Sequence, residues 1–271
     1  MNPTQIRGQI VSEFEKTLQN VKARKIVGLS KSDAYGHEAG MPVESWAINV
    51  LRANGWKAYY PNEFLAEVFS GIGKDEIKIT RALTNIWWAP LLVSRQQIKK
   101  FISGEVLGRW QQEGADIVLK YGASIEQVIL INVKSHESKR SSRPPNIMSA
   151  QRLIEFFHGI LRRNAEMINR VELWFLGVYY SASEKGAEAS SVFIRDLFKL
   201  DTSQIPQINF DAAIQIQWHI EDMVEIQQSK PEFIKRLAET FITEWRTHSR
   251  SKTKKYEKLV GEISHLIKSY K

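Results

Sequence analysis

The chain has 271 residues and no cysteine, which excludes disulfides, thiolate catalysis and cysteine-based zinc sites and fits a reducing cytosol. Hydrophobic residues make up 43% of it and charged residues 25%, as in soluble globular proteins, and no apolar stretch approaches the roughly 20 residues that cross a membrane. The formal net charge of +8 favours a polyanionic partner such as nucleic acid, although an ordinary basic enzyme would account for it about as well.

The first 110 residues are predicted to be mainly helical. Apolar residues recur at helical spacing over residues 4–24, which indicates an amphipathic helix. A second helix is expected to have Pro42 in its first turn, where proline is tolerated, and to end at Gly55. These are followed by a short strand (residues 56–61), a helix that a glycine closes (residues 61–73) and a helix over residues 94–110.

The clearest predicted strands are residues 115–120 and residues 127–135. Side chains alternate along a strand, so Asn132 and Lys134 share one face of the second strand. Asp116 lies near the start of the first strand. The pair therefore brings one carboxylate, one amide and one lysine onto neighbouring strands.

The second half of the chain alternates helices with strands. Ser149 is a candidate N-cap for a helix over residues 149–167. Strands between helices, with loops of mixed length, indicate an α/β fold around a mixed sheet. No repeat or long linker interrupts the chain, which favours a single domain, residues 1–271, that ends in helices over 231–271. The further elements expected are strands at 171–183, 187–194 and 208–218, and two helices near 231–248 and 253–270.

The strand pair carries the residue types of a metal-dependent site for cleaving phosphodiesters. A hard cation such as Mg²⁺ takes oxygen ligands, and a carboxylate such as Asp116 would anchor it beside a phosphate. Lys134 lies two residues after Asn132 on the same strand face, where a lysine orients the attacking water or stabilises charge on the phosphate. Two ordinary strands whose polar residues meet solvent give the same pattern more often.

Several separated segments carry a more specific pattern. They are residues 36–46 (GHEAGMPVESW), 91–95 (LLVSR), 144–153 (PPNIMSAQRL) and 212–223 (AAIQIQWHIEDM). In this order they resemble segments of the HincII family of type II restriction endonucleases, which have the PD-(D/E)xK nuclease fold. The resemblance implies a restriction-endonuclease-like mixed central sheet flanked by helices, in a bacterial enzyme that uses Mg²⁺.

The resemblance also assigns roles position by position. Asp116 resembles the family's first metal-binding aspartate, and Lys134 resembles its catalytic lysine. Asn132 stands where the family has a second metal-binding aspartate, so this sequence carries an amide in place of a carboxylate. Asn146 and Asn209 resemble asparagines that contact bases in the major groove, a use that suits an amide because it offers one donor and one acceptor.

Further candidates follow from the same resemblance and from local charge. Glu44, on the predicted second helix, resembles a glutamate that faces the metal site, although an acid in a first turn also suits the helix dipole. Arg143 stands where the family has a glutamine that wedges into the DNA stack, and an arginine there would stack or reach a phosphate instead. The remaining DNA-binding candidates are Arg95, Lys139 and Arg140.

We therefore expect a Mg²⁺-dependent type II restriction endonuclease subunit that acts as a homodimer on a short palindrome in double-stranded DNA, because the two symmetries match. The resemblance implies a site like GTYRAC and blunt ends. Two alternatives stay open at Asn132: a non-catalytic DNA-binding protein that has lost its metal site, and a disabled variant in which asparagine replaces a native aspartate. In either case, the sequence as it stands should cleave slowly or not at all.

Overall fold

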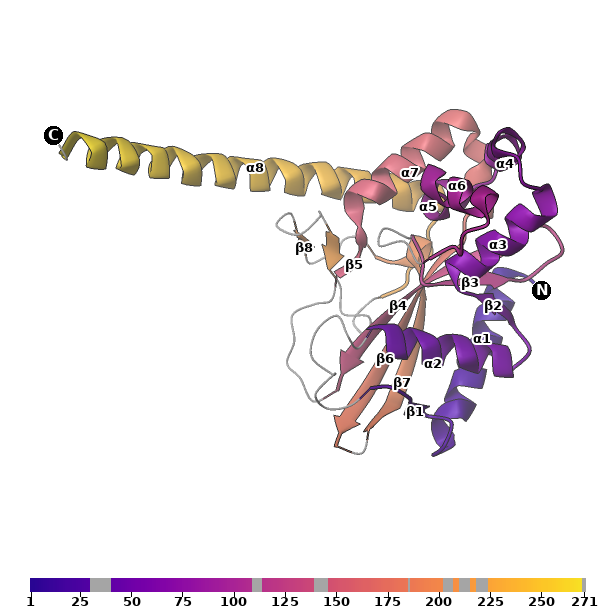
Figure 1. Ribbon diagram of the computed structural model, residues 1–271. Coiled ribbons are helices and arrows are strands. Elements are labelled where there is room, and N and C mark those ends of the chain that lie inside the picture. Colours follow the sequence, from indigo (N-terminus) through magenta and orange to yellow (C-terminus); the bar gives the residue numbers. More distant parts are fainter. Residues whose placement is uncertain are drawn as a thin grey trace.

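The chain folds around a six-stranded mixed sheet with helices on both faces (Figure 1). This arrangement confirms the predicted mixed α/β fold. No helix among the described residues is both long enough and apolar enough to span a membrane. The computed structural model describes residues 1–29, 40–108, 114–138, 146–184, 186–201, 207–209, 215–217 and 224–269.

The strands of the large sheet follow the order β1-β7-β6-β4-β3-β2. Neighbouring strands are antiparallel except for β4 and β6, which run parallel. The predicted strand pair is therefore the antiparallel pair β3–β4, and β6 lies in the middle of the sheet. The strand bounds are β1 Lys25–Ile26, β2 Lys57–Tyr59, β3 Ile117–Lys120, β4 Val128–Glu137, β6 Leu173–Ser183 and β7 Gly186–Asp196.

Most of the predicted helices are present, with changed ends. Ser149 caps its helix as predicted, because its Oγ accepts a hydrogen bond from the Arg152 N–H at 3.2 Å. The helix predicted over residues 94–110 ends at Ser103, since Gly104 adopts a left-handed φ of 80°. The helices are α1 Pro3–Gln19, α2 Gly40–Ala53, α3 Pro61–Ile72, α4 Glu76–Leu83, α5 Ala89–Leu92, α6 Arg95–Ser103, α7 Ala150–Arg163 and α8 Lys230–Ser269, with 3-10 turns η2 Ala165–Arg170 and η3 Leu197–Lys199.

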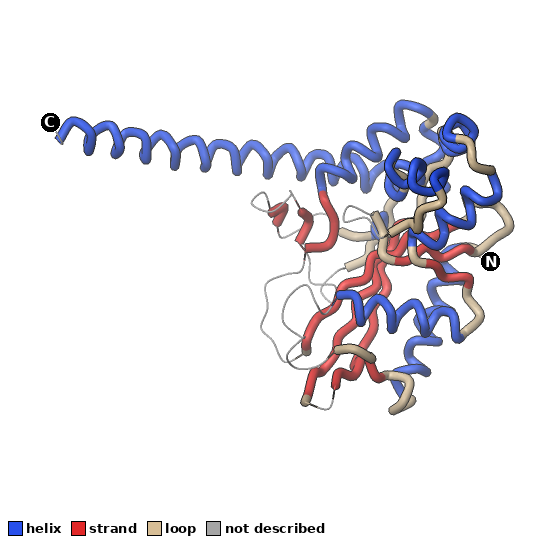
Figure 2. The backbone as a smooth tube through the Cα atoms, viewed as in Figure 1, coloured by secondary structure: helices blue, strands red, loops and turns tan. Residues whose placement is uncertain are grey.

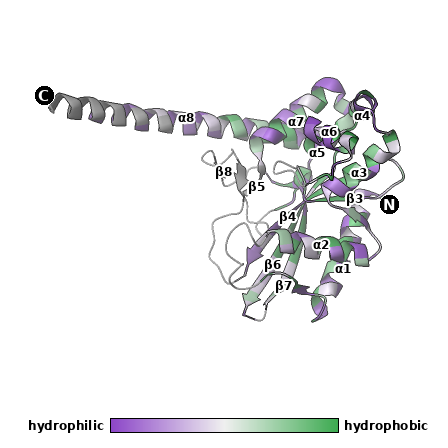
Figure 3. Ribbon diagram, viewed as in Figure 1, coloured by the Kyte–Doolittle hydropathy of each residue, from purple (hydrophilic) through white to green (hydrophobic). Residues whose placement is uncertain are grey.

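Strand alternation divides the hydrophobic core between the two faces of the sheet. On β4, Ile129, Ile131 and Val133 pack in the cluster that contains residues of α1 and α2. Val128 and Leu130 pack in the other cluster, with residues of α3 and α7. Each large apolar side chain buried in this way contributes about 1.5–3 kcal/mol, so both faces fix the register of β4. Hydrophobic residues accordingly gather where the helices meet the sheet (Figure 3).

A second sheet consists of three short antiparallel strands in the order β5-β9-β8. It lies apart from the large sheet, on the side toward which α8 extends (Figure 2). The prediction of one strand over residues 208–218 is wrong, because β8 and β9 within that range are two separate strands that pair with each other. The strand bounds are β5 Asn146–Ser149, β8 Gln207–Asn209 and β9 Gln215–Gln217.

The C-terminal residues predicted as two helices form the single helix α8, which is 40 residues long. At 1.5 Å per residue its length is about 60 Å, and much of it projects away from the rest of the chain (Figure 1). The prediction placed a break between residues 248 and 253, where serine, threonine and lysine interrupt the apolar periodicity. Lysine and arginine are good helix formers, so the polar run continues the helix.

The base of α8 is anchored in the core. Phe233 and Leu237 are buried there. Lys230 donates hydrogen bonds to the Glu172 carboxylate at 2.9 Å and to the Asn169 carbonyl at 3.1 Å. Burial raises the pKa of Glu172 above its ordinary value, although the Lys230 ammonium acts in the opposite direction. The first turns of α8 are therefore fixed by both apolar packing and a buried ion pair.

Candidate functional site

The predicted site residues meet where β3 diverges from β4. The regular ladder of the two strands ends at the pair Ile117–Ile131. Just beyond it, the Asp116 N–H still donates to the Ile131 carbonyl at 2.9 Å, and side chains add further bonds: Asp116 Oδ2 accepts from the Val133 N–H at 2.7 Å. Asn132 Nδ2 donates to the Gly114 carbonyl at 3.0 Å. The structure thus brings Asp116 and Asn132 together on neighbouring strands and gives each a fixed orientation.

Lys134 lies two residues beyond Asn132 on β4 and is half-buried. Alternation puts it on the same strand face as Asn132. Its partner in the register of the parallel strand β6 is Gly177, which contributes no side chain to either face. On the other side, β3 has already diverged. Gly177 therefore places no side chain directly beside Lys134.

Gly114 is a site residue that the sequence reasoning missed. Its carbonyl accepts the Asn132 amide, and its N–H donates to the Leu91 carbonyl at 2.9 Å. A Cβ at this position would lie 2.8 Å from Leu91 Cβ and 3.0 Å from the Leu91 carbonyl oxygen, closer than real Cβ atoms approach. Only glycine lets the chain pass this closely. Its one signal in the sequence is its place just before a predicted strand.

The residues that the structure describes do not form a complete Mg²⁺ site. Asp116 supplies one carboxylate, and the nitrogen of the Asn132 amide is turned to Gly114. Within the described ranges, no three His, Cys, Asp or Glu side chains gather in an arrangement that could hold a metal ion. A hard cation takes several oxygen ligands, and carboxylates provide most of the attraction. This donor set falls short of that requirement by at least one carboxylate.

Glu44 is half-buried on α2. That helix packs in the cluster formed by the Ile131 and Val133 side chains, whereas Asn132 and Lys134 alternate to the other face of β4. None of the contacts described joins Glu44 to Asp116 or Lys134. Its role at a metal site stays a prediction.

Asn146 and Asn209, the two candidates for base contacts, belong to the same small sheet. Asn146 begins β5 and lies opposite Gln217 of β9. Asn209 ends β8 and lies opposite Gln215 of the same strand. Two asparagines that are 63 positions apart in the sequence are thus joined through β9. Lys139, Arg140 and Arg143 lie outside the described residues, so their DNA-binding roles stay predictions.

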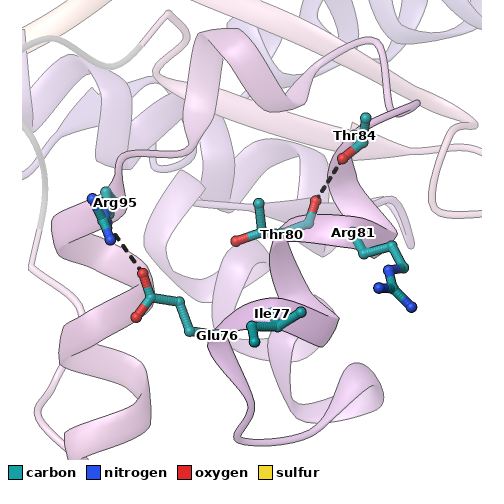
Figure 4. Close-up of a pocket in the computed structure, with 6 residues that line it drawn as sticks. All are labelled: Glu76, Ile77, Thr80, Arg81, Thr84 and Arg95. Carbon is teal, nitrogen blue, oxygen red and sulfur yellow. Dashed lines mark hydrogen bonds and ion pairs between the residues drawn. The ribbon is translucent and has the colours of Figure 1, made fainter.

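Arg95 begins α6 and is involved in an ion pair with Glu76 of α4, with 3.1 Å between Nε and Oε1. Its side chain is 81% exposed. Figure 4 shows this interaction as a dashed line, and both side chains line a surface cavity of about 530 Å³. An ion pair this exposed contributes about 0–1 kcal/mol, so it would not prevent Arg95 from contacting a phosphate. The cavity is lined by Glu76, Ile77, Thr80, Arg81, Thr84 and Arg95.

Comparison with known proteins shows which proteins the chain resembles. The family described as restriction endonuclease HincII matches residues 17–262, a range that contains β3, β4 and the small sheet. The type II restriction enzyme HindII of Haemophilus influenzae (strain Rd) is 26% identical over 255 residues, which cover 89% of this chain and 91% of that enzyme. The type II restriction enzyme HincII of Haemophilus influenzae is 28% identical over 254 residues, with the same shares of the two chains.

Proposed function

Because the chain belongs to the HincII family of restriction endonucleases, a family of deoxyribonucleases that its match over residues 17–262 identifies, we propose that it recognises a short palindrome in double-stranded DNA as a homodimer. We place the cleavage site at the divergence of β3 and β4. This placement rests on the two hydrogen bonds that orient the Asp116 and Asn132 side chains where the two strands diverge. Lys134 lies two residues beyond Asn132.

Cleavage by this sequence is proposed to be slow or absent, because position 132 holds an amide. By resemblance to the family, Asn132 stands where its members have an aspartate. The Asn132 amide donates to the Gly114 carbonyl, which an ionised carboxylate cannot do. The site therefore has one carboxylate, Asp116, where family members have two. Mg²⁺ is the cofactor we expect for the family reaction, and this chain should bind it weakly.

The sequence read in DNA is proposed to resemble GTYRAC, with a blunt cut. Support comes from the small sheet, which holds both Asn146 and Asn209 in its backbone ladder. Pairing through one sheet fixes the backbone spacing of the two residues, as contact with base edges requires. Arg143 replaces the glutamine expected at the central step, so the central base pairs are the part of the site most open to change.

A second candidate function is sequence-specific DNA binding without catalysis. The hydrogen bond from Asn132 to Gly114 favours it, because the amide is integrated into the local structure. A disabled variant of an active enzyme would contain the same asparagine, and in that case the ancestral aspartate would restore cutting.

A plasmid digest separates these possibilities. The parent and Asn132→Asp are incubated with plasmid DNA at about 10 mM Mg²⁺, well above the weak affinity of sites with one or two carboxylates. Discrete fragments from Asn132→Asp alone, lost again when Lys134→Ala is added, would support the impaired nuclease. Rapid cutting by the parent would refute the role of Asn132. No cutting by Asn132→Asp would favour the binding protein.

Assembly is tested on the parent by light scattering. A homodimer should have about twice the 31.2 kDa mass of the chain. A monomer at micromolar concentration, both with and without a duplex that contains GTTAAC, would contradict the proposed symmetry.

A further inference from the structure

Among the described residues, the apolar contacts that join α8 to the core extend from its base as far as Phe241. Phe241 packs against the core, and its ring stacks on Trp245 with 6.2 Å between ring centroids. Farther along, Thr247 donates to the Thr243 carbonyl at 3.0 Å within the helix itself. Figure 1 shows the far half of α8 projecting beyond the other elements. A helix that leaves the body in this way presents its side chains to a partner or to solvent.

Four exposed cations form a row along this part of α8, and we call them the basic row. They are Arg246, Arg250, Lys254 and Lys258. Each lies four residues from the next, so each is about 6 Å further along the helix axis and rotated by about 40°. The basic row therefore winds only slowly around the helix and presents its charges to one side.

The charge pattern of the basic row is unlike that of an ordinary solvated helix. Solvated helices gain support from opposite charges four residues apart, and the base of α8 shows such a pair between Lys235 and Glu239. In the basic row, each cation instead has another cation four residues away, although Glu257 follows Lys254 by three residues and Glu262 lies 3.8 Å from Lys258. Like charges at this spacing destabilise a helix about as much as opposite charges stabilise it. A polyanion bound along the row would remove that repulsion.

Two observations indicate that the polyanion is DNA. The chain belongs to a family of DNA-cutting enzymes. In addition, α8 contacts β8, the strand that ends in Asn209, so the helix passes beside the small sheet that carries both candidates for base contacts. We propose that the basic row binds backbone phosphates of double-stranded DNA outside the recognised bases. The inference rests on the proposed function, because it takes the small sheet as the surface that reads the DNA.

The dimensions agree with this assignment. The basic row spans 12 residues, or about 18 Å of helix. One DNA strand carries a phosphate about every 3.4 Å along the duplex axis, so about five phosphates of one strand lie within that span. Four long cationic side chains can therefore each reach a phosphate without any bend in α8.

The test neutralises the basic row without changing any apolar residue. In the row variant, Arg246, Arg250, Lys254 and Lys258 are all changed to glutamine, which keeps a high helix propensity. The control variant makes the same change in charge on the exposed residues Lys16, Lys22, Lys74 and Lys78. Binding to 30-base-pair duplexes, one with GTTAAC and one scrambled, is measured without divalent metal at several salt concentrations. Circular dichroism checks that α8 stays helical.

The salt dependence of binding should separate the two variants. Each phosphate contact contributes about 0.9 to the slope of log K against log salt, so the row variant should lose about 3.6 of slope per protomer, or about 7.2 for the proposed homodimer. It should weaken equally on both duplexes, because phosphate contacts carry no sequence information. Shortening the duplex to 12 base pairs should weaken the parent more than the row variant. The control variant should keep the slope of the parent.

Other outcomes would overturn the inference in distinguishable ways. An unchanged slope in the row variant, or an equal loss of slope in the control variant, would refute phosphate binding by the basic row and leave the proposed function intact. Loss of the dimer in light scattering with an unchanged slope would show that the row contacts a second copy of the chain instead. A parent that binds neither duplex at low salt would refute the proposed function and this inference together.

Discussion

Asn132→Asp should destabilise the protein in the absence of divalent metal and should make its stability depend on Mg²⁺. Asn132 is only 7% exposed, and its amide donates to the Gly114 carbonyl at 3.0 Å. An ionised aspartate cannot donate, so that carbonyl loses its partner. Leaving a buried acceptor unsatisfied costs about 1–3 kcal/mol, and the Asp116 carboxylate nearby adds repulsion. We expect the free energy of unfolding to fall by about 2 kcal/mol or more.

Mg²⁺ should then recover part of this loss. An ion that binds the folded chain with a dissociation constant of about 1 mM would, at about 10 mM, stabilise it by about 1.4 kcal/mol. The assay is urea unfolding of the parent, Asn132→Asp and Asn132→Ala, each in EDTA and in Mg²⁺. The alanine variant loses the same hydrogen bond but gains no carboxylate, so Mg²⁺ should not rescue it.

The hydrogen bond to Gly114 and the metal contact at position 132 are tested separately. Equal stability of parent and Asn132→Asp in EDTA would show that the hydrogen bond to Gly114 contributes nothing. A rescue by Mg²⁺ that is the same in the alanine and aspartate variants would show that position 132 does not contact the metal.

Three further predictions concern other parts of the chain. Gly114→Ala should lower the free energy of unfolding by about 1–3 kcal/mol, because the added Cβ would overlap Leu91. Its control, Gly8→Ala on α1, has open space around the added Cβ and should stabilise the protein by up to about 1 kcal/mol. Equal urea midpoints for the two variants would refute the overlap. Burial raises the pKa of Glu172, so the contribution of this residue to stability is complete below its ordinary pKa of 4.5 and declines as pH rises through the raised folded pKa. Glu172→Gln should abolish that decline at pH values above about 4.5. An unchanged pH profile of urea unfolding in this variant would count against the prediction. Asn146→Ala should reduce the preference for a GTTAAC duplex over a scrambled one by about 1–3 kcal/mol; equal weakening on both in a binding titration would show that Asn146 does not contact a base.

Local patterns predicted where the candidate site residues lie in the fold, and their roles at the site stay predictions. The alternation of apolar residues around Asn132 and Lys134 indicates which face they share, and β4 confirms that strand. Hydrogen bonding at the divergence of β3 and β4 could not be predicted in the same way. It depends on the packing of Gly114 against Leu91, and these two residues are 23 positions apart in the sequence.

Errors in the predicted fold have equally specific causes. The alternation of residues 208–218 is the same for one strand as for two, so the sequence pattern did not reveal that β8 and β9 pair with each other. In α8, polar residues interrupt the apolar stripe although the backbone stays helical. The short helices α4 and α5 were not predicted, because their burial comes from tertiary packing around Trp87 and Trp88 rather than from a long amphipathic repeat.

The topology of the sheet has a consequence for the order of folding. β3 and β4 are joined by seven residues, 121–127, and pair as neighbours in the chain. The small sheet instead pairs β5 with β9, which begins 69 positions after the first residue of β5. Since loop closure over a long segment is slower than over a short one, the strands that hold Asp116 and Asn132 should form early. The surface proposed to read DNA should assemble late, when the β3–β4 hairpin is already in place.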